Sequence, residues 1–149
     1  MSLKKLAVAF CAIALLAGCS GKKGMMNGVD HNLVRDFETN VGDRVHFEFD
    51  KSHLTKDAKT TIHRQAEWLK AHPAIRVSVQ GHCDERGTRE YNLALGERRA
   101  DAAKKALEAH GVHANRLETV SYGKERPAVL GTDEAAHAAN RRAVSVLQQ

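Results

Sequence analysis

The stretch 81–99 constrains this chain most, because it has the pattern of a strand end, a polar loop and a helix start. Before it, apolar Ile75, Val77 and Val79 alternate with polar residues, which is the period of a half-buried strand. After it, residues 92–108 carry apolar side chains at helical spacing. The sequence therefore predicts a strand, a loop and a helix in direct succession.

Two polar residues interrupt the apolar face of this predicted helix. Asn92 and Arg99 are two helical turns apart on nearly the same azimuth, whereas Arg98 falls on the solvent face. A guanidinium stays charged inside a protein, so an inward-pointing arginine must be paired or its burial is costly. The nearest candidate partner is Asp84, just past the end of the strand.

Asp84 and Arg99 allow two interpretations. In the first, they form a structural ion pair that ties the loop to the helix. In the second, they flank a gap that is filled by a ligand with both an ammonium and a carboxylate group, with helix N–H groups nearby. Spacing alone leaves both interpretations open.

Three motifs carry a resemblance to a known family. They are G-H-C-D-E-R-G-T-R-E-Y-N-L-A-L-G-E-R-R-A from residue 81, S-Y-G-K-E-R-P at 121–127 and N-R-R-A-V at 140–144. Residues 41–149 resemble the peptidoglycan-associated lipoproteins of the OmpA-like domain family. The resemblance implies non-covalent binding of meso-diaminopimelate in peptidoglycan stem peptides, with Asp84 and Arg99 as the residues that hold it.

The same resemblance implies a wider site and a set of partners. Further ligand-binding residues are expected to be Asn92, Asp50 and Leu95, and supporting residues to be Gly81, His82, Asn140 and Arg141. No cofactor is implied. The implied partners are peptidoglycan, TolB and the other Tol-Pal components, which act in outer-membrane integrity and cell division.

Residues 1–18 have the pattern of a lipoprotein signal peptide. A basic start and a short apolar run lead to Leu16-Ala17-Gly18-Cys19, so Cys19 is expected to be acylated and to anchor the chain stably in a membrane. The competing interpretation is an ordinary secretory signal with an incidental cysteine. Ser20, rather than aspartate, follows Cys19, which by lipoprotein sorting preferences implies the outer membrane, facing the periplasm.

The remaining chain divides into a linker and one domain. Residues 19–40 are expected to form the lipidated N-terminus and a flexible linker, although a weak helical turn is conceivable there. Within 41–149, strands are expected at 45–49, 75–81, 117–122 and 143–147, and helices at 54–69, 92–108 and 133–140. This β-α-β-α-β-α-β order predicts a two-layer α/β (α+β) sandwich, with a mixed sheet and helices on one side.

Composition and motifs exclude several function classes. The formal charge of +5 falls to +3 without Lys4 and Lys5, and acidic residues are interleaved with the basic ones, which argues against nucleic-acid binding. His82 and Asp84 are expected on one side of the extended segment and Cys83 on the other, so the three should not converge on one metal ion. No nucleophile with an assigned base stands out, so we expect no enzyme. The alternatives are a periplasmic cell-wall hydrolase and a protein-only interaction module.

Cys83 is the one cysteine that remains after loss of the signal peptide and acylation of Cys19. Related sequences usually carry Ala or Thr at this position. We therefore expect Cys83 to be a small, mostly buried residue without a nucleophilic role.

Overall fold

A mixed four-stranded sheet forms the centre of the computed structural model, which describes residues 25–149. Its strands lie in the order β3 (Arg44–His46), β6 (Arg142–Gln148), β4 (Arg76–His82) and β5 (Leu117–Gly123). β4 runs parallel to β5, whereas β6 is antiparallel to both β4 and β3. The parallel pairing is possible because a long helix connects β4 to β5.

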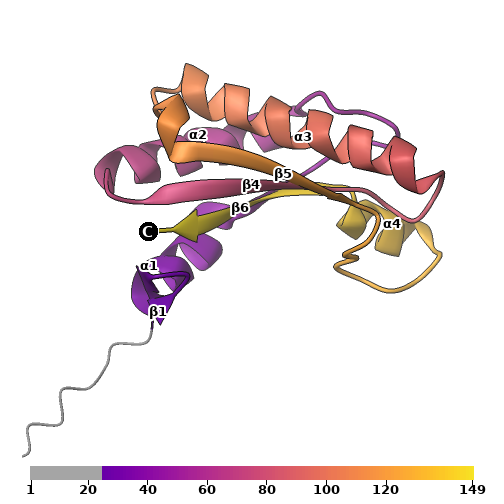
Figure 1. Cartoon of the computed structure of the whole chain (residues 1–149), viewed down its shortest axis with the longest axis horizontal. Helices are drawn as coiled ribbons and strands as arrows, with labels where there is room; N and C mark the ends of the chain where they lie inside the picture. The colour runs from indigo at the N-terminus through magenta and orange to yellow at the C-terminus, as the bar shows by residue number, and fades with distance from the viewer. Residues whose placement is uncertain (1–24) are drawn as a thin grey trace, which may run out of the picture.

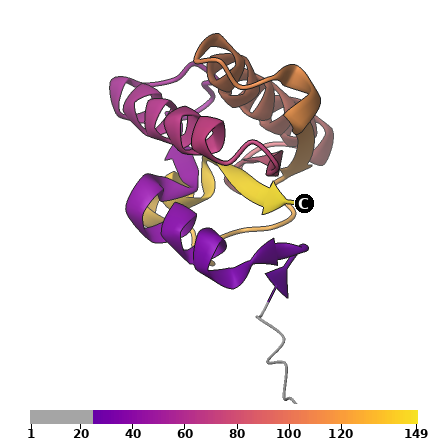
Figure 2. The same cartoon turned by 90° about the vertical axis from the view of Figure 1, so that its left-hand side faces the viewer.

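Two helices, α2 (Lys56–Ala71) and α3 (Arg89–Ala109), cover one face of this sheet, as Figures 1 and 2 show. Each begins at a threonine, Thr55 or Thr88, whose hydroxyl accepts a backbone N–H of the first turn. Gly111, at φ +99°, follows the end of α3 in the left-handed conformation that glycine adopts without strain. The two-layer α/β architecture predicted from the sequence is confirmed.

Several shorter elements flank the sheet and its two long helices. They include η2 (Ala114–Arg116), a 3-10 turn before β5, α4 (Glu134–Asn140), just before β6, and the hairpin of β1 (Met25–Met26) with β2 (Val29–Asp30). None of the helices within residues 25–149 is both long and apolar enough to cross a membrane.

The expectation of a flexible linker up to residue 40 is wrong for residues 25–40. Helix α1 (His31–Asp36) and the π-helix η1 (Phe37–Gly42) follow the hairpin and pack on the domain, beside its C-terminus in Figure 1. Val29, Val34 and Phe37 belong to the hydrophobic core, and the Phe37 ring lies 5.0 Å from that of Trp68. Burial of these side chains offsets the entropy lost on ordering the segment. The predicted signal peptide and Cys19 lie outside the described residues.

The first strand is shorter than predicted, because β3 ends at His46 instead of continuing to Phe49. The carbonyls of Glu48 and Lys51 accept hydrogen bonds from the Arg99 side chain. Phe49 consequently leaves the sheet and is 56% exposed. An alternating pattern cannot show that a distant arginine will bind these carbonyls in place of a neighbouring strand.

Candidate ligand-binding site

A pocket of about 240 Å³ lies where β4 ends and α3 begins. The loop 83–88 joins the two elements, so the end of the strand and the first turns of the helix form adjacent walls. All five residues expected to bind the ligand line it, namely Asp50, Asp84, Asn92, Leu95 and Arg99. The structure therefore brings the predicted set together.

Asp84 is buried at the pocket wall, with 4% of its surface exposed. It accepts hydrogen bonds from the Arg86 backbone N–H at 3.1 Å and from the Arg86 side chain at 3.1 and 2.8 Å. Burial alone would raise the pKa of Asp84, but the hydrogen bonds from Arg86 prevail and lower it. Asp84 is thus a charged carboxylate at neutral pH.

Arg99 is buried to 1% and is held by backbone carbonyls. Its Nε donates to Lys51 at 2.8 Å, its Nη1 to His82 at 2.9 Å and its Nη2 to Glu48 at 3.2 Å. Burial lowers the pKa of Arg99, but from so high a value that the guanidinium stays charged. These three bonds use three of the five N–H groups of the guanidinium and leave one on each terminal nitrogen.

No ion pair joins Asp84 to Arg99 within residues 25–149, so the structural-pair interpretation of the sequence is wrong. Asp84 pairs with Arg86 and, at 3.6 Å, with Arg141, while carbonyl dipoles hold Arg99. Opposite charges therefore line one pocket without neutralising each other. A zwitterionic group has the charge pattern that fits between them.

The profile of the OmpA family matches residues 46–143. The chain is 46% identical to the peptidoglycan-associated lipoprotein of Mesorhizobium japonicum, over 94% of this chain and 89% of that protein. It is 47% identical to the one from Pasteurella multocida, over 89% of this chain and 90% of that protein.

The chain belongs to the OmpA family. A crystal structure of the peptidoglycan-associated lipoprotein from Burkholderia pseudomallei superimposes with a TM-score of 0.69 at 46% identity, over 71% of this chain and 90% of that one. The C-terminal domain of Helicobacter pylori MotB superimposes with a TM-score of 0.67 at 24% identity, over 72% and 86%, which shows the shared fold alone. The OmpA-like topology predicted from the sequence is confirmed.

Three residues next to Asp84 and Arg99 shape the pocket of this OmpA-family domain. Asn92 is buried, and its Nδ2 donates to the carbonyls of Arg86 at 2.8 Å and Thr88 at 2.9 Å, which fixes the loop against the helix. Leu95 is buried, and its side chain forms an apolar part of the pocket wall. Asp50 lies across the pocket, where it accepts a hydrogen bond from the Tyr91 hydroxyl.

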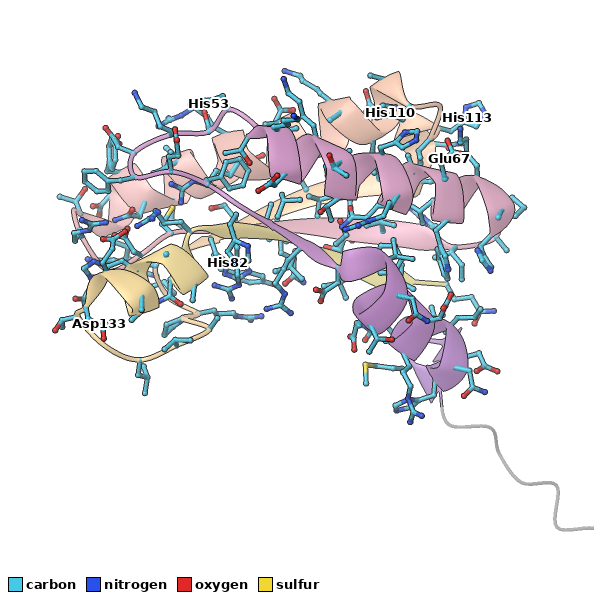
Figure 3. All side chains as sticks on the ribbon, turned by 180° about the vertical axis from the view of Figure 1, so that it is seen from behind. His53, Glu67, His82, His110, His113 and Asp133 are labelled. Carbon is cyan, nitrogen blue, oxygen red and sulfur yellow. The ribbon has the colours of Figure 1, made fainter. Side chains whose placement is uncertain are left out.

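The expected supporting residues Gly81 and His82 act only through the backbone. A Cβ on Gly81 would lie 1.8 Å from the Gly96 carbonyl oxygen, so glycine is what lets α3 approach β4. The His82 carbonyl accepts from Arg99, but its ring lies on the face of the sheet away from α2 and α3, as Figure 3 shows. The His82 side chain is therefore not among those that line the pocket.

Asn140 and Arg141 lie beside the pocket. Asn140 accepts N–H groups from Ala128 and Val129, so it shapes the loop before α4. Arg141 donates from Nε to the Phe47 carbonyl at 2.9 Å and faces Asp84 with Nη1 at 3.6 Å. Both contacts fit a supporting position.

Five other residues line the pocket and were not predicted, namely Phe49, Cys83, Arg86, Gly87 and Tyr91. Arg86 is the most consequential, because it occupies both oxygens of Asp84 and stacks on Phe49 at 3.9 Å. The sequence spacing could have predicted this contact, because an aspartate in a turn commonly accepts a hydrogen bond from the backbone N–H of the residue two positions later. Within residues 25–149, no group of three or more His, Cys, Asp or Glu side chains is arranged to hold a metal ion.

His82 is expected to make this domain acid-labile. Burial, together with the charge of Arg142 and Arg126, lowers the pKa of His82 to about 4, and its Nδ1 has no hydrogen-bond partner. An unfolded histidine titrates near about 6.5. Between these two pKa values the unfolded chain binds a proton at His82 and the folded domain does not. The stability of the domain therefore falls as the pH drops from about 6.5 towards 4.

The expected loss from His82 is about 2 kcal/mol between pH 7.5 and pH 5. Urea unfolding of the wild type and of His82→Gln at both pH values measures it. The glutamine variant should lose less stability over this interval than the wild type. Equal losses in the two proteins would show that His82 does not cause the lability.

Proposed function

We propose that this chain binds peptidoglycan non-covalently through the meso-diaminopimelate of its stem peptides. The observation that carries the proposal is the pair Asp84 and Arg99, two opposite charges that line one pocket and are not paired to each other. Relatives of nearly the same length are named peptidoglycan-associated lipoproteins, which supports peptidoglycan as the ligand.

The free end of diaminopimelate carries an ammonium and a carboxylate, and each of these groups has a complementary partner. The ammonium would bind Asp84, whose carboxylate has lone pairs beyond those used by Arg86. The carboxylate would accept the remaining N–H groups of Arg99, and the N-terminus of α3 adds a favourable field for an anion. Arg86 is part-exposed, so it can share Asp84 or turn into solvent when the ammonium arrives.

The pocket supports binding rather than turnover. The thiol of Cys83 is held protonated because burial raises its pKa, which makes it a poor nucleophile. His82, the imidazole nearest to Asp84 in the sequence, faces the other side of the sheet. A cell-wall hydrolase would cleave peptidoglycan fragments on incubation, whereas the proposed binding protein leaves them intact.

In the cell, this domain would join the outer membrane to the cell wall as a lipid-anchored protein facing the periplasm. We infer partnership with TolB and the rest of the Tol-Pal system, and a part in membrane integrity and division. The support is the lipoprotein pattern that ends at Cys19 and the relatives' shared name.

Two matched peptides test the ligand directly. One contains meso-diaminopimelate and the other contains lysine, which has the ammonium but lacks the second carboxylate. The wild-type protein is expected to bind the first more tightly and to sediment with purified sacculi. Equal affinity for the two peptides would rule out a carboxylate contact by Arg99.

Replacing Cys19 with Ser is expected to block lipidation, because serine has no thiol to acylate. The variant should remain unprocessed or soluble, as measured by membrane fractionation and mass spectrometry. Recovery in the outer-membrane fraction with an acyl mass would contradict the assigned anchor.

Replacing Cys83 with Ala is expected to preserve both the fold and sacculus binding. Cys83 is 3% exposed, and its thiol donates a hydrogen bond to the Asn92 carbonyl at 3.3 Å, so the change should cost about 1 kcal/mol. Thermal melting and co-sedimentation with sacculi measure the two properties. Lost binding at unchanged stability would reveal a role for the thiol in the pocket.

A further inference from the structure

His63 and His110 form a surface pair that takes no part in the pocket. His63 lies on α2 and His110 caps the end of α3, so the pair bridges the two helices. Their Nδ1 atoms are 3.5 Å apart, and the rings meet edge to face with centroids 5.0 Å apart. Both residues are exposed.

This separation is long for a hydrogen bond but suits two ligands of one metal ion. N–H···N and N–H···O bonds in proteins cluster near about 2.9–3.0 Å. A zinc ion holds histidine nitrogens at about 2.0–2.1 Å, so two nitrogens on one tetrahedral ion lie about 3.4 Å apart. The observed 3.5 Å between the Nδ1 atoms is close to that value.

One carboxylate on α2 lies near the pair, and it is itself paired with Lys70. Glu67 follows His63 by one helical turn, and Figure 3 shows it at the same end of the molecule as His110. The pKa of Glu67 is lowered, chiefly by a hydrogen bond from Lys70. An ionised carboxylate therefore stands near both imidazoles.

We propose that His63 and His110 bind one divalent transition-metal ion of the zinc class through their Nδ1 atoms. Water completes the coordination shell. Because the two ligands come from α2 and α3, a bound ion clamps the two helices together. The site is distinct from the peptidoglycan pocket, and its test does not depend on the proposed function.

Calorimetric titration of the untagged full chain with zinc chloride, after treatment with a chelator, tests the site. The wild type is expected to bind in a saturable manner, and His63→Ala or His110→Ala each to weaken binding at least about tenfold. His53→Ala is the matched control, because His53 is an exposed histidine at the opposite end of the molecule in Figure 3, and its affinity should match the wild type.

Thermal melting supplies a second readout. Zinc should raise the melting temperature of the wild type and of His53→Ala, because only the folded chain brings the two imidazoles together. The shift should disappear in His63→Ala and in His110→Ala. Absence of saturable zinc binding, or zinc affinity in either variant equal to that of the wild type, would overturn the proposal.

Discussion

Asp84→Asn is expected to abolish practical binding of diaminopimelate peptides while the domain stays folded. The change keeps the side-chain shape but removes the charge that partners the ligand ammonium, and leaves Arg99 and Arg141 beside it without that counter-charge. The expected cost to binding is about 2–5 kcal/mol, and Asp84→Ala should cost at least as much. Calorimetric titration with the diaminopimelate peptide measures this change.

Stability should fall less than affinity in Asp84→Asn. The principal partner of Asp84 is Arg86, whose side chain is 36% exposed and can turn to water when the carboxylate is lost. Arg98→Ala is the matched control, since Arg98 lies one residue before Arg99 but on the exposed side of α3, and it should change affinity by well under about 1 kcal/mol. Wild-type affinity in Asp84→Asn would refute the assigned contact.

Arg99→Ala is expected to weaken both the fold and the binding of the ligand. The substitution empties a fully buried site and leaves the carbonyls of Glu48, Lys51 and His82 without their donor. We expect a loss of about 3–5 kcal/mol in the free energy of unfolding. Affinity is measured at a temperature where circular dichroism shows the variant folded, and there it should fall by about 2–5 kcal/mol.

Arg116 offers a control that separates these two effects. Its side chain also donates to backbone carbonyls, those of Leu69, His72 and Ile75, but it precedes β5, outside the pocket. Arg116→Ala should therefore lower stability and leave the affinity of the folded protein unchanged. If folded Arg99→Ala bound the peptide as tightly as Arg116→Ala, Arg99 would be a purely structural residue.

The sequence by itself determined the elements that depend on short-range pattern. The alternation before residue 81 and the helical spacing after it fixed β4 and α3, and Thr55 marked the start of α2. The same periodicity placed Asn92 and Arg99 inside and Arg98 outside, as the structure has them. A charged residue at a buried helical position is informative because it cannot be left without partners.

Hydrophobic periodicity was less reliable at predicting which residues pack against each other. Leu93 is apolar like Leu95 but is 37% exposed, because residues two apart on a helix lie about 200° from each other around its axis. The ordered segment 25–42 was missed because its few apolar residues gain burial only from Trp68 and the core, which are distant in the sequence.

Only the tertiary structure decided the partners of each charge. Arg99 donates to three carbonyls, two of them in a loop about fifty residues earlier in the chain. Asp84 pairs with Arg86 and Arg141 instead of with Arg99. His63 and His110 likewise meet only because α2 and α3 lie side by side on the sheet. Local spacing sets which face of an element a side chain occupies. The choice among several possible partners depends instead on long-range packing, which a single sequence does not reveal directly.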